Sequence, residues 1–370
     1  MPVDGECVRF PLRLVVPFLA ALACTGAAQA GTGLVVGVDD DTIKWQAKPN
    51  GVVGVTRDLG VDALRVTVPW QRGQTSPSKL QQAYLHRVAL AVALGQRVVL
   101  AVYGTPAEAP LTAGQRADYC GFLVHVLKRI PRIDDVVVWN EVNNPVFWPK
   151  SAGPAPYEAL LARCWDTLHA LRASVNVIDS TAPHQDPGAV LAGLGVAYRA
   201  SGRTRPILDT FGHNVYPESS AEPPSTAHPD SLSIDQGDYP RLMSVLAGAF
   251  GGTGQPLPGQ GRTTIWYLED GFQTAVPRTL AHLYRGTEND SRAVAADQQA
   301  AQLRAALQLA YCQPAVGGFF NFELIDEPRL VGWQSGLMYA GARPKPAYDA
   351  FKQAAADVHA GRVDCARLNP

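Results

Sequence analysis

Two glutamates of the 370-residue sequence each end a run of apolar, mostly β-branched or aromatic residues. Glu141 follows residues 136–140 (VVVWN), and Glu269 follows residues 265–268 (IWYL). A carboxylate at the end of such a run costs free energy unless water, a partner or a function compensates it. Cleavage of a glycosidic bond requires two carboxylates, because one protonates the leaving oxygen while the other attacks or stabilises the developing cation. The alternative is that each glutamate pairs with a nearby arginine in a solvated rim.

The elements that would position these glutamates recur eight times along the chain. The predicted strands are residues 34–38, 63–68, 97–103, 135–139, 175–180, 208–215, 264–268 and 317–322. Amphipathic, helix-like stretches between and after them include residues 80–94, 115–128, 157–171, 239–250, 293–311 and 347–356. Strands that alternate with helices indicate a parallel sheet of the α/β class. Eight such units predict a (β/α)8 TIM barrel that forms a single catalytic domain.

In a barrel of this kind the catalytic groups stand at the C-terminal ends of the strands. Glu141 follows the fourth predicted strand, and Glu269 follows the seventh. Strands that are three apart in a ring of eight can face each other across its mouth. We therefore expect the two carboxylates to converge on one cavity.

The composition argues against several classes of protein. Hydrophobic residues make up 46% of the chain and charged residues 18%, which is enough apolar material for a sizeable core and is not typical of disorder. The 32 Lys and Arg residues nearly balance the 33 Asp and Glu residues. Because the chain has no basic excess, we predict no nucleic-acid partner.

The N-terminal segment is typical of an export signal. Its apolar run, residues 14–24, is shorter than the roughly 20 residues of a membrane span, and Ala28-Gln29-Ala30 follows as a cleavage site. We predict that residues 1–30 are a signal peptide and that residues 31–370 form a secreted barrel domain with no membrane partner. A lipoprotein anchor at Cys24 is the alternative, which the position of Leu22 disfavours.

Four cysteines follow the predicted cleavage site, and an even number in an exported chain suggests two disulfides with three conceivable pairings. Cys120 and Cys164 fall in the third and fourth predicted helices, which are neighbours around a barrel. Cys312 ends the seventh predicted helix, and Cys365 lies in the C-terminal tail. This placement favours the pairs Cys120–Cys164 and Cys312–Cys365.

No metal site or cofactor is predicted. The chain has no Cys-x-x-Cys pair and no His-Glu-x-x-His motif, which zinc sites commonly use. Residues 251–261 (GGTGQPLPGQG) precede a strand and lack the lysine of a phosphate-binding loop. Three consecutive acids, residues 39–41, lack the ligand spacing of a calcium or magnesium site, so we expect a solvated loop there.

At this point the sequence resembles a known group. Residues 139–148 (WNEVNNPVFW) resemble the W-N-E-P-N-x-x-x-F-W signature of retaining glycoside hydrolases of clan A, particularly family 39 and also family 5, although Val142 replaces the proline. Residues 269–274 (EDGFQT) are similar to the clan's nucleophile motif, E-x-G-aromatic-x-T. With residues 319–336 and 345–348, the resemblance covers nearly all of the mature chain. It implies that Glu141 is the acid/base and Glu269 the nucleophile, with carboxyl groups about 5–5.5 Å apart.

Further residues near strand ends are candidates for substrate binding. Arg65 resembles the clan's strand-two arginine that keeps the nucleophile ionised, and its alternative role is a buried structural ion pair. We expect Asn140 to donate a hydrogen bond to the sugar 2-hydroxyl. At the end of the sixth strand, Tyr216 could donate to Glu269, and His213 could orient Glu269 or the substrate. A purely structural role for His213 fits the pattern equally well.

Aromatic residues near strand ends offer flat faces to a pyranose ring. Trp333 resembles the clan's platform tryptophan at the cleavage subsite. Trp148, and with it Trp70 and Tyr103, could serve outer subsites, and rim packing is the alternative for each. Burial and the charge of Glu269 predict a raised pKa for Glu141.

Taken together, these residues predict a secreted, cofactor-free retaining β-glycosidase. Its substrate is predicted to be a poly- or oligosaccharide, whose O-glycosidic bonds it hydrolyses by double displacement through a covalent glycosyl-enzyme intermediate. Two alternatives stay open at this point. One is a carbohydrate-binding barrel without catalysis, and the other is a transglycosylase that uses the same intermediate.

Overall fold

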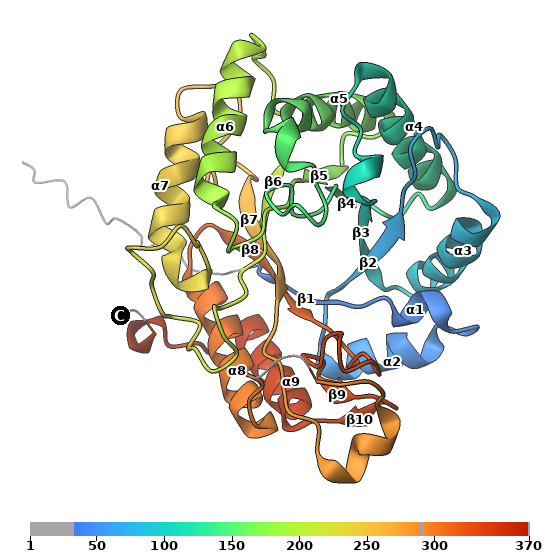
Figure 1. The fold of residues 1–370 in the computed structure, drawn as a ribbon, viewed down its shortest axis with the longest axis vertical. Coiled ribbons are helices and arrows are strands. Elements are labelled where there is room, and N and C mark those ends of the chain that lie inside the picture. Colours follow the sequence, from blue (N-terminus) through green and yellow to red (C-terminus); the bar gives the residue numbers. More distant parts are fainter. Residues whose placement is uncertain (1–32, 289–291, 369–370) are drawn as a thin grey trace, which may run out of the picture.

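Eight parallel strands close into a barrel in the computed structural model, which describes residues 33–288 and 292–368 (Figure 1). Each strand pairs with the next in sequence, and β8 pairs with β1. The strands are β1 Val35–Asp39, β2 Ala63–Pro69, β3 Arg97–Tyr103, β4 Asp135–Val138, β5 Asn176–Ile178, β6 Thr210–His213, β7 Thr264–Asp270 and β8 Val316–Phe322. The predicted (β/α)8 fold is confirmed. The predicted signal peptide, residues 1–30, lies outside the described residues.

Helices surround the barrel on its outer face (Figure 1). They are α1 Thr42–Trp45, α2 Asn50–Leu59, α3 Lys79–Ala93, α4 Ala113–Arg129, α5 Ala155–Leu171, α6 Pro187–Ala200, α7 Tyr239–Phe250, α8 Ala296–Cys312 and α9 Pro346–His359. A two-stranded antiparallel sheet, β9 Met338–Tyr339 with β10 Arg343–Pro344, lies between β8 and α9 in the sequence. Within the described ranges, the helices are too short or too polar to cross a bilayer.

The interior of the barrel is filled by side chains from alternate strand positions, as the two-residue period of a strand requires. These buried residues are Ala63, Val99, Ala101, Val137, Ile178, Trp266, Leu268 and Phe320. Gly37 of β1 makes room for Phe320, because a Cβ there would lie 2.1 Å from its ring. The opposite faces of the strands pack against the helices in one continuous apolar core.

Local sequence sets where several helices begin. Ser78 and Thr112 accept hydrogen bonds from the third residue of α3 and α4, and a glutamine there returns a bond in each case, which forms a capping box. Asp186 caps α6. Helix α8 begins at Ala296, three residues later than predicted, because Val294 pairs with Gln273.

Both predicted disulfides are present. Cys120 of α4 pairs with Cys164 of α5, and Cys312 at the end of α8 pairs with Cys365. The first bridge joins two neighbouring helices of the ring, and the second ties the C-terminal tail to α8.

We expect removal of the Cys120–Cys164 bridge to destabilise the protein. The bridge closes a loop with a sequence separation of 44 residues, for which chain entropy predicts a loss of about 4 kcal/mol in the free energy of unfolding. Urea denaturation of the double variant Cys120→Ser/Cys164→Ser measures this loss. An unchanged unfolding midpoint would contradict the expectation.

Candidate active site

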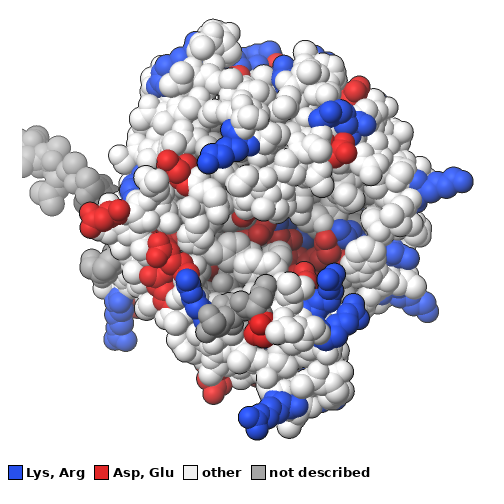
Figure 2. Space-filling view, in the orientation of Figure 1, with Lys and Arg blue, Asp and Glu red and all other residues white. Residues whose placement is uncertain are grey.

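A cavity of about 1140 Å³ opens at the C-terminal ends of the strands, and both Glu141 and Glu269 line it. Figure 2 shows the hollow, with acidic side chains gathered in it. The carboxylates that line it are Asp39, Asp40, Asp41, Glu141, Glu218, Glu269, Glu323, Asp326 and Glu327. The two glutamates singled out from the sequence therefore reach one cavity, as expected from strands β4 and β7.

Glu269 is held between a guanidinium and a phenol. Its Oε1 accepts from Nη1 of Arg65 at 2.7 Å, and its Oε2 accepts from the Tyr216 hydroxyl at 2.9 Å. Arg65 is buried and also pairs with Asp39. Although burial opposes it, the charges of Asp39 and Glu269 raise the pKa of Arg65 further above its usual value. The ion pair with Arg65 and the hydrogen bond from Tyr216 together fix the position of the Glu269 carboxyl group in the cavity.

Glu141 stands on a constrained turn after β4. Trp139 and Glu141 both have positive φ, 69° and 39°, which is costly for residues other than glycine. Hydrogen bonds hold this turn, because Ser180 accepts from the backbone N–H of Glu141 and of Val142, each at 3.1 Å. A proline at position 142 could not donate the second bond.

Two side-chain amides donate hydrogen bonds to the carboxyl group of Glu141. Asn144 donates from Nδ2 to Oε2, and Asn214 donates from Nδ2 to Oε1, each at 2.7 Å. Burial and the charge of Glu269 raise the pKa of Glu141 to about 7, and the two amides oppose that rise because they stabilise the carboxylate. The sequence predicted a raised pKa for Glu141 from burial and from the charge of Glu269, and the structure confirms both the direction and the two causes.

Asn140 is oriented so that its amide nitrogen is free to meet a ligand. Its Oδ1 accepts from Nη2 of Arg65 at 2.9 Å and from the Ser180 hydroxyl at 3.3 Å. Because the oxygen is engaged by two donors and Asn140 lines the cavity, Nδ2 is the atom left for an acceptor in the cavity.

Two predicted substrate-binding residues are corrected by the structure. His213 is buried, and both ring nitrogens are engaged, Nδ1 with Thr181 Oγ1 at 2.7 Å and Nε2 with the carbonyl of Ile234 at 2.7 Å. Burial lowers the pKa of His213 to about 4, so the ring is neutral and structural. Trp148 is also buried, packs against Trp139 and Tyr157, and does not line the cavity.

Of the other aromatic candidates, two line the cavity and one is buried in the core. Trp333 lines the cavity with 38% of its surface exposed, and its ring lies 5.1 Å from that of Tyr216. Tyr103 also lines the cavity, whereas Trp70 is buried against Tyr119 and Trp139 in the core. Trp333 and Tyr103 can therefore meet a sugar ring, and Trp70 cannot.

The acids at positions 39–41 are not a solvated loop, so that expectation is wrong. Asp39 pairs with Arg65, and Asp41 accepts from Lys44 and Thr67. Asp40 is buried and accepts from the backbone N–H groups of Thr42, Leu324 and Ile325. The run thus joins β1 to β2 and to the segment that follows β8.

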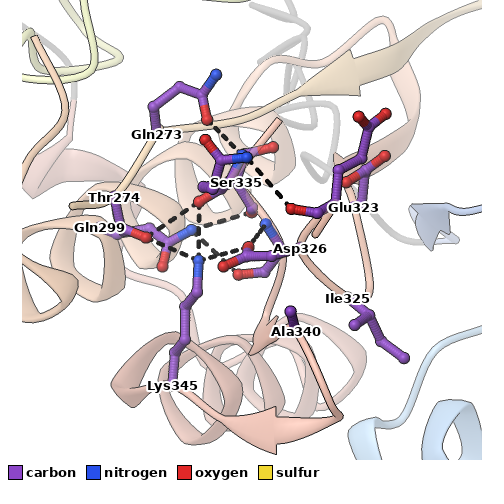
Figure 3. Close-up of polar contacts among 12 residues, drawn as sticks. Gln273, Thr274, Gln299, Glu323, Ile325, Asp326, Ser335, Ala340 and Lys345 are labelled. Carbon is purple, nitrogen blue, oxygen red and sulfur yellow. Dashed lines mark hydrogen bonds and ion pairs between the residues drawn. The ribbon is translucent and has the colours of Figure 1, made fainter. Parts of the chain in front are cut away.

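A buried network supports the wall of the cavity that follows β8 (Figure 3). All three N–H groups of Lys345 are used, since its Nζ donates to Asp326, Thr274 and the carbonyl of Gln334 at 2.7–2.8 Å. Tyr284 and the backbone of Gly336 also donate to Asp326. Breaking one partner of such a buried pair is strongly unfavourable, so this network fixes the wall.

The wall presents Glu323 to the cavity with one carboxyl oxygen that makes no hydrogen bond to the protein. Its Oε2 is buried and has no hydrogen bond, and burial together with the charges of Asp40 and Glu327 raises its pKa well above the usual value. Lys345 and Arg65 form their ion pairs with Asp326 and Glu269 and make no hydrogen bond to Oε2 of Glu323. A polar group of a ligand can satisfy the free oxygen.

One group among the described residues has the spacing of a metal site, Glu222, His228 and Asp235 on the loop after β6. His228 Nε2 lies 3.0 Å from Glu222, and Nδ1 lies 3.0 Å from Asp235 and 3.1 Å from Asp238. Although burial opposes it, these contacts raise the pKa of His228 to about 9. Because His228 lies within 3.1 Å of three carboxylates of the same loop, we interpret this cluster as a group of ion pairs that joins parts of the loop.

Sequence reasoning missed Asn144, Asn214 and Glu323. Asn144 and Asn214 stand beside motifs that the sequence did single out, one within residues 139–148 and the other directly after His213. Glu323 directly follows the last residue of β8, so the strand-end rule that selected Glu141 and Glu269 could have selected it as well.

No family model matches the sequence, and no curated protein matches it. Several solved structures do match this chain. A family 39 glycoside hydrolase from the gut symbiont Bacteroides cellulosilyticus WH2 matches with a TM-score of 0.62 at 16% identity over 89% of this chain and 64% of that one. A GH53 catalytic domain from Ignisphaera aggregans matches with a TM-score of 0.61 at 16% identity, over 86% of this chain and 95% of that one.

An exo-β-1,4-mannosidase from Opitutaceae bacterium strain TAV5 matches with a TM-score of 0.58 at 16% identity over 91% of this chain. The chain spans 60% of the length of that mannosidase and less than two thirds of the family 39 structure. These likenesses show that the chain has the (β/α)8 fold of these glycoside hydrolases.

Proposed function

We propose that the protein is a retaining β-glycosidase of clan A that hydrolyses O-glycosidic bonds in poly- or oligosaccharides. The observation that carries the proposal is the difference between two carboxylates in one cavity. Glu269 is paired with Arg65, whereas burial and the charge of Glu269 raise the pKa of Glu141 to about 7. One group suited to attack and one suited to donate a proton are the two that a retaining mechanism needs.

In the first step, Glu141 donates its proton to the glycosidic oxygen while a carboxylate oxygen of Glu269 attacks the anomeric carbon. The bond to the leaving group breaks, and a glycosyl ester forms on Glu269. Tyr216 and Arg65 hold the attacking carboxylate in place. Asn140 Nδ2 is available to donate to the sugar 2-hydroxyl, where a hydrogen bond strengthens in the transition state.

In the second step, Glu141 acts as the base. Esterification removes the negative charge of Glu269, and that charge is one of the causes of the raised pKa of Glu141. The pKa of Glu141 therefore falls when the intermediate forms, and the ionised group can take a proton from water. The water then attacks the anomeric carbon and releases Glu269.

The charge of the cavity favours a neutral sugar. Nine carboxyl groups and one arginine, Arg292, line it, so carboxyl groups outnumber cations among its lining residues. A carboxylate on the substrate would meet like charges, which costs free energy at short range. We therefore expect β-glucosides, β-xylosides or β-mannosides to be hydrolysed in preference to β-glucuronides.

A panel of aryl β-glycosides and polysaccharides tests the proposal. Proton NMR of the product during the first turnovers reports the anomer released, and we expect the β-anomer to appear first. Sugar binding without turnover, unaffected by Glu269→Ala, would instead indicate a binding barrel. Product analysis at high acceptor concentration separates hydrolysis from transglycosylation.

We also propose that the mature protein is secreted. The support is the pair of disulfides, Cys120–Cys164 and Cys312–Cys365, since such bridges persist in oxidising compartments. N-terminal sequencing of the protein recovered outside the cytoplasm tests this, and a mature chain that starts at Gly31 is the expected result.

The pH profile of kcat/KM should depend on the two amides that donate hydrogen bonds to Glu141. Because the Asn144 and Asn214 amides lower the pKa of Glu141, Asn214→Ala raises it. Glu141 must be protonated to act as the acid, so the alkaline limb of the kcat/KM profile moves to higher pH. The matched control is Asn143→Ala, because Asn143 bonds Ala182 and Gln185 and not Glu141. A limb that stays in place or moves to lower pH in Asn214→Ala contradicts this assignment.

A further inference from the structure

The pairing of β4 with β5 stops before the turn that carries Glu141. The last paired residues are Val137 of β4 and Ile178 of β5. Beyond that point the carbonyl of Val138 and the N–H groups of Glu141 and Val142 need other partners, because a buried backbone group without a hydrogen bond costs free energy. A side chain of α5 and a residue that follows β5 supply these partners.

Tyr157 and Ser180 are these partners, and both are fully buried. The Tyr157 hydroxyl donates to the carbonyl of Val138 at 2.8 Å and accepts from the Ser180 N–H at 3.3 Å. Ser180 Oγ accepts from the Glu141 N–H, and the Ser180 carbonyl accepts from the Val142 N–H, each at 3.1 Å. Helix α5, which lies outside β5 in Figure 1, therefore holds the turn after β4 through two connected residues.

The segment that begins at Ser180 also supports the side chain of Glu141. The carbonyl of Thr181 accepts from the Asn214 N–H at 2.8 Å. The side-chain amide of Asn214 donates in turn to Oε1 of Glu141 at 2.7 Å. One short stretch after β5 thus fixes the backbone of the proposed acid directly and its carboxyl group through Asn214.

The turn needs such support because it is strained. Trp139 and Glu141 have φ values of 69° and 39°, and a residue other than glycine stays in that region only where its surroundings hold it there. Tyr157 and Ser180 do not line the cavity, so neither is placed to contact a bound sugar. Any effect that they have on the reaction passes through the residues that they hold.

We propose that Tyr157 and Ser180 are positioning residues for the acid/base, and that together they hold Glu141 where it can protonate the leaving oxygen. The inference rests on the proposed glycosidase function and adds to it two residues that touch no substrate. When either hydroxyl is removed, the turn can relax toward ordinary backbone angles and carry the carboxyl group toward water. Proton donation is then impaired, whereas the nucleophile, which has partners of its own, keeps its place.

Two variants that each remove one hydroxyl, Tyr157→Phe and Ser180→Ala, test the pair on aryl β-glycosides of the sugar that the protein hydrolyses best. A 2,4-dinitrophenyl group leaves without a proton, whereas a phenyl leaving group needs one. We expect kcat/KM for the phenyl glycoside to fall by about 10- to 100-fold and kcat/KM for the dinitrophenyl glycoside by less than about threefold. A defect of the whole cavity would lower both values alike.

The matched control for Tyr157→Phe is Tyr198→Phe. Tyr198 of α6 is also a buried tyrosine on a helix, and its hydroxyl also donates to a backbone carbonyl, that of Arg205. Because this bond lies away from the turn after β4, both substrates should keep their kcat/KM in the control.

A double-variant cycle shows whether the pair acts through Glu141. Either substitution, made on top of Glu141→Ala, should change kcat/KM for the phenyl glycoside by less than about twofold, because the group through which it acts is absent. A further loss of about tenfold there would mean that the two residues act elsewhere in the cavity. Ser180 also donates to Asn140, but Arg65 still holds that amide oxygen in Ser180→Ala.

The pKa of Glu141 gives a readout that needs no turnover. Burial is the largest cause of its raised value, so a turn that relaxes toward water lowers the pKa toward the ordinary range. ¹³C NMR of protein labelled at the glutamate carboxyl carbon measures this pKa, and Glu141→Gln assigns the signal. Tyr157→Phe and Ser180→Ala should both give a lower pKa than the unaltered protein and Tyr198→Phe.

The positioning pair and the proposed function can fail separately. A lower Glu141 pKa in the variants of a protein that hydrolyses no glycoside supports the pair and removes the hydrolase. Activity that falls alike for both leaving groups, or a Glu141 pKa that stays unchanged, removes the pair and keeps the hydrolase. Either variant decides the matter if the other does not fold.

Discussion

Glu269→Gly is expected to lower kcat/KM for a natural glycoside by roughly 10⁴- to 10⁶-fold, the range seen when a nucleophile that acts in a covalent mechanism is removed. The physical reason is that, among the residues the structure describes, Glu269 is the carboxylate that contacts both Arg65 and Tyr216. Without an attacking oxygen at the anomeric carbon, the glycosyl ester cannot form, and the reaction loses its two-step path. Initial rates on the best substrate of the panel give the magnitude.

The variant should fold, which makes its loss of activity interpretable. Arg65 keeps Asp39 as a partner when Glu269 is absent, so no buried cation is left unpaired. Circular dichroism and the thermal midpoint check this. The matched control is Glu327→Gln, another carboxylate of the same cavity that contacts neither Arg65 nor Tyr216, and we expect a loss below about tenfold.

Small anions give a second readout of the same variant. Azide can occupy the space that the Glu269 carboxylate leaves, and it should restore turnover of aryl glycosides with activated leaving groups. Because azide attacks in place of the nucleophile, the product is the glycosyl azide of inverted configuration. Equal activity losses in Glu269→Gly and Glu327→Gln, with no azide rescue, would remove Glu269 from the role of nucleophile.

The barrel could be predicted because its strands are β-branched runs with sharp ends. Each of the eight predicted runs overlaps one strand of the barrel, and Arg97–Tyr103 has the predicted bounds. Helices α2 and α6 were not among the helices named from the sequence, and both contain glycines that weaken a helical pattern. In α6 the glycine has a packing reason, because a Cβ at Gly195 would lie 2.2 Å from the carbonyl oxygen of Ala249 on α7. Tertiary packing selects glycine where local propensity would not.

The site was predictable where a strand end places the side chain, and less so elsewhere. The rule that catalytic residues stand at the C-terminal ends of strands selects Glu141 and Glu269. The same rule selected His213, which is buried and structural. Successive residues of a strand face opposite sides, so His213 turns toward Ile234 while Asn214 reaches Glu141. Asn144 contacts Glu141 through the fold of a loop, and loop geometry is not encoded in a simple period. One position along the strand therefore separates a structural residue from a functional one.

Glu141→Ala is expected to separate the two halves of the reaction. Substrates whose leaving group needs a proton should lose roughly 10²- to 10⁴-fold in kcat/KM, the contribution typical of a general acid, whereas activated aryl glycosides should still form the glycosyl ester. The ester then persists, because the base that activates water is also missing. A burst of aryl alcohol followed by a slow steady state is the expected kinetic result.

Azide should end that slow phase in Glu141→Ala, because an anion needs no base to attack the ester. Attack from the face opposite Glu269 inverts the anomeric carbon a second time, so the glycosyl azide has the retained configuration. The contrast with Glu269→Gly, where the azide product is inverted, assigns each carboxylate by stereochemistry instead of by loss of rate. Asn143→Ala, whose side chain does not touch Glu141, should show neither the burst nor the rescue. An inverted azide product from Glu141→Ala would mean that the two glutamates have exchanged roles or that hydrolysis takes a single step.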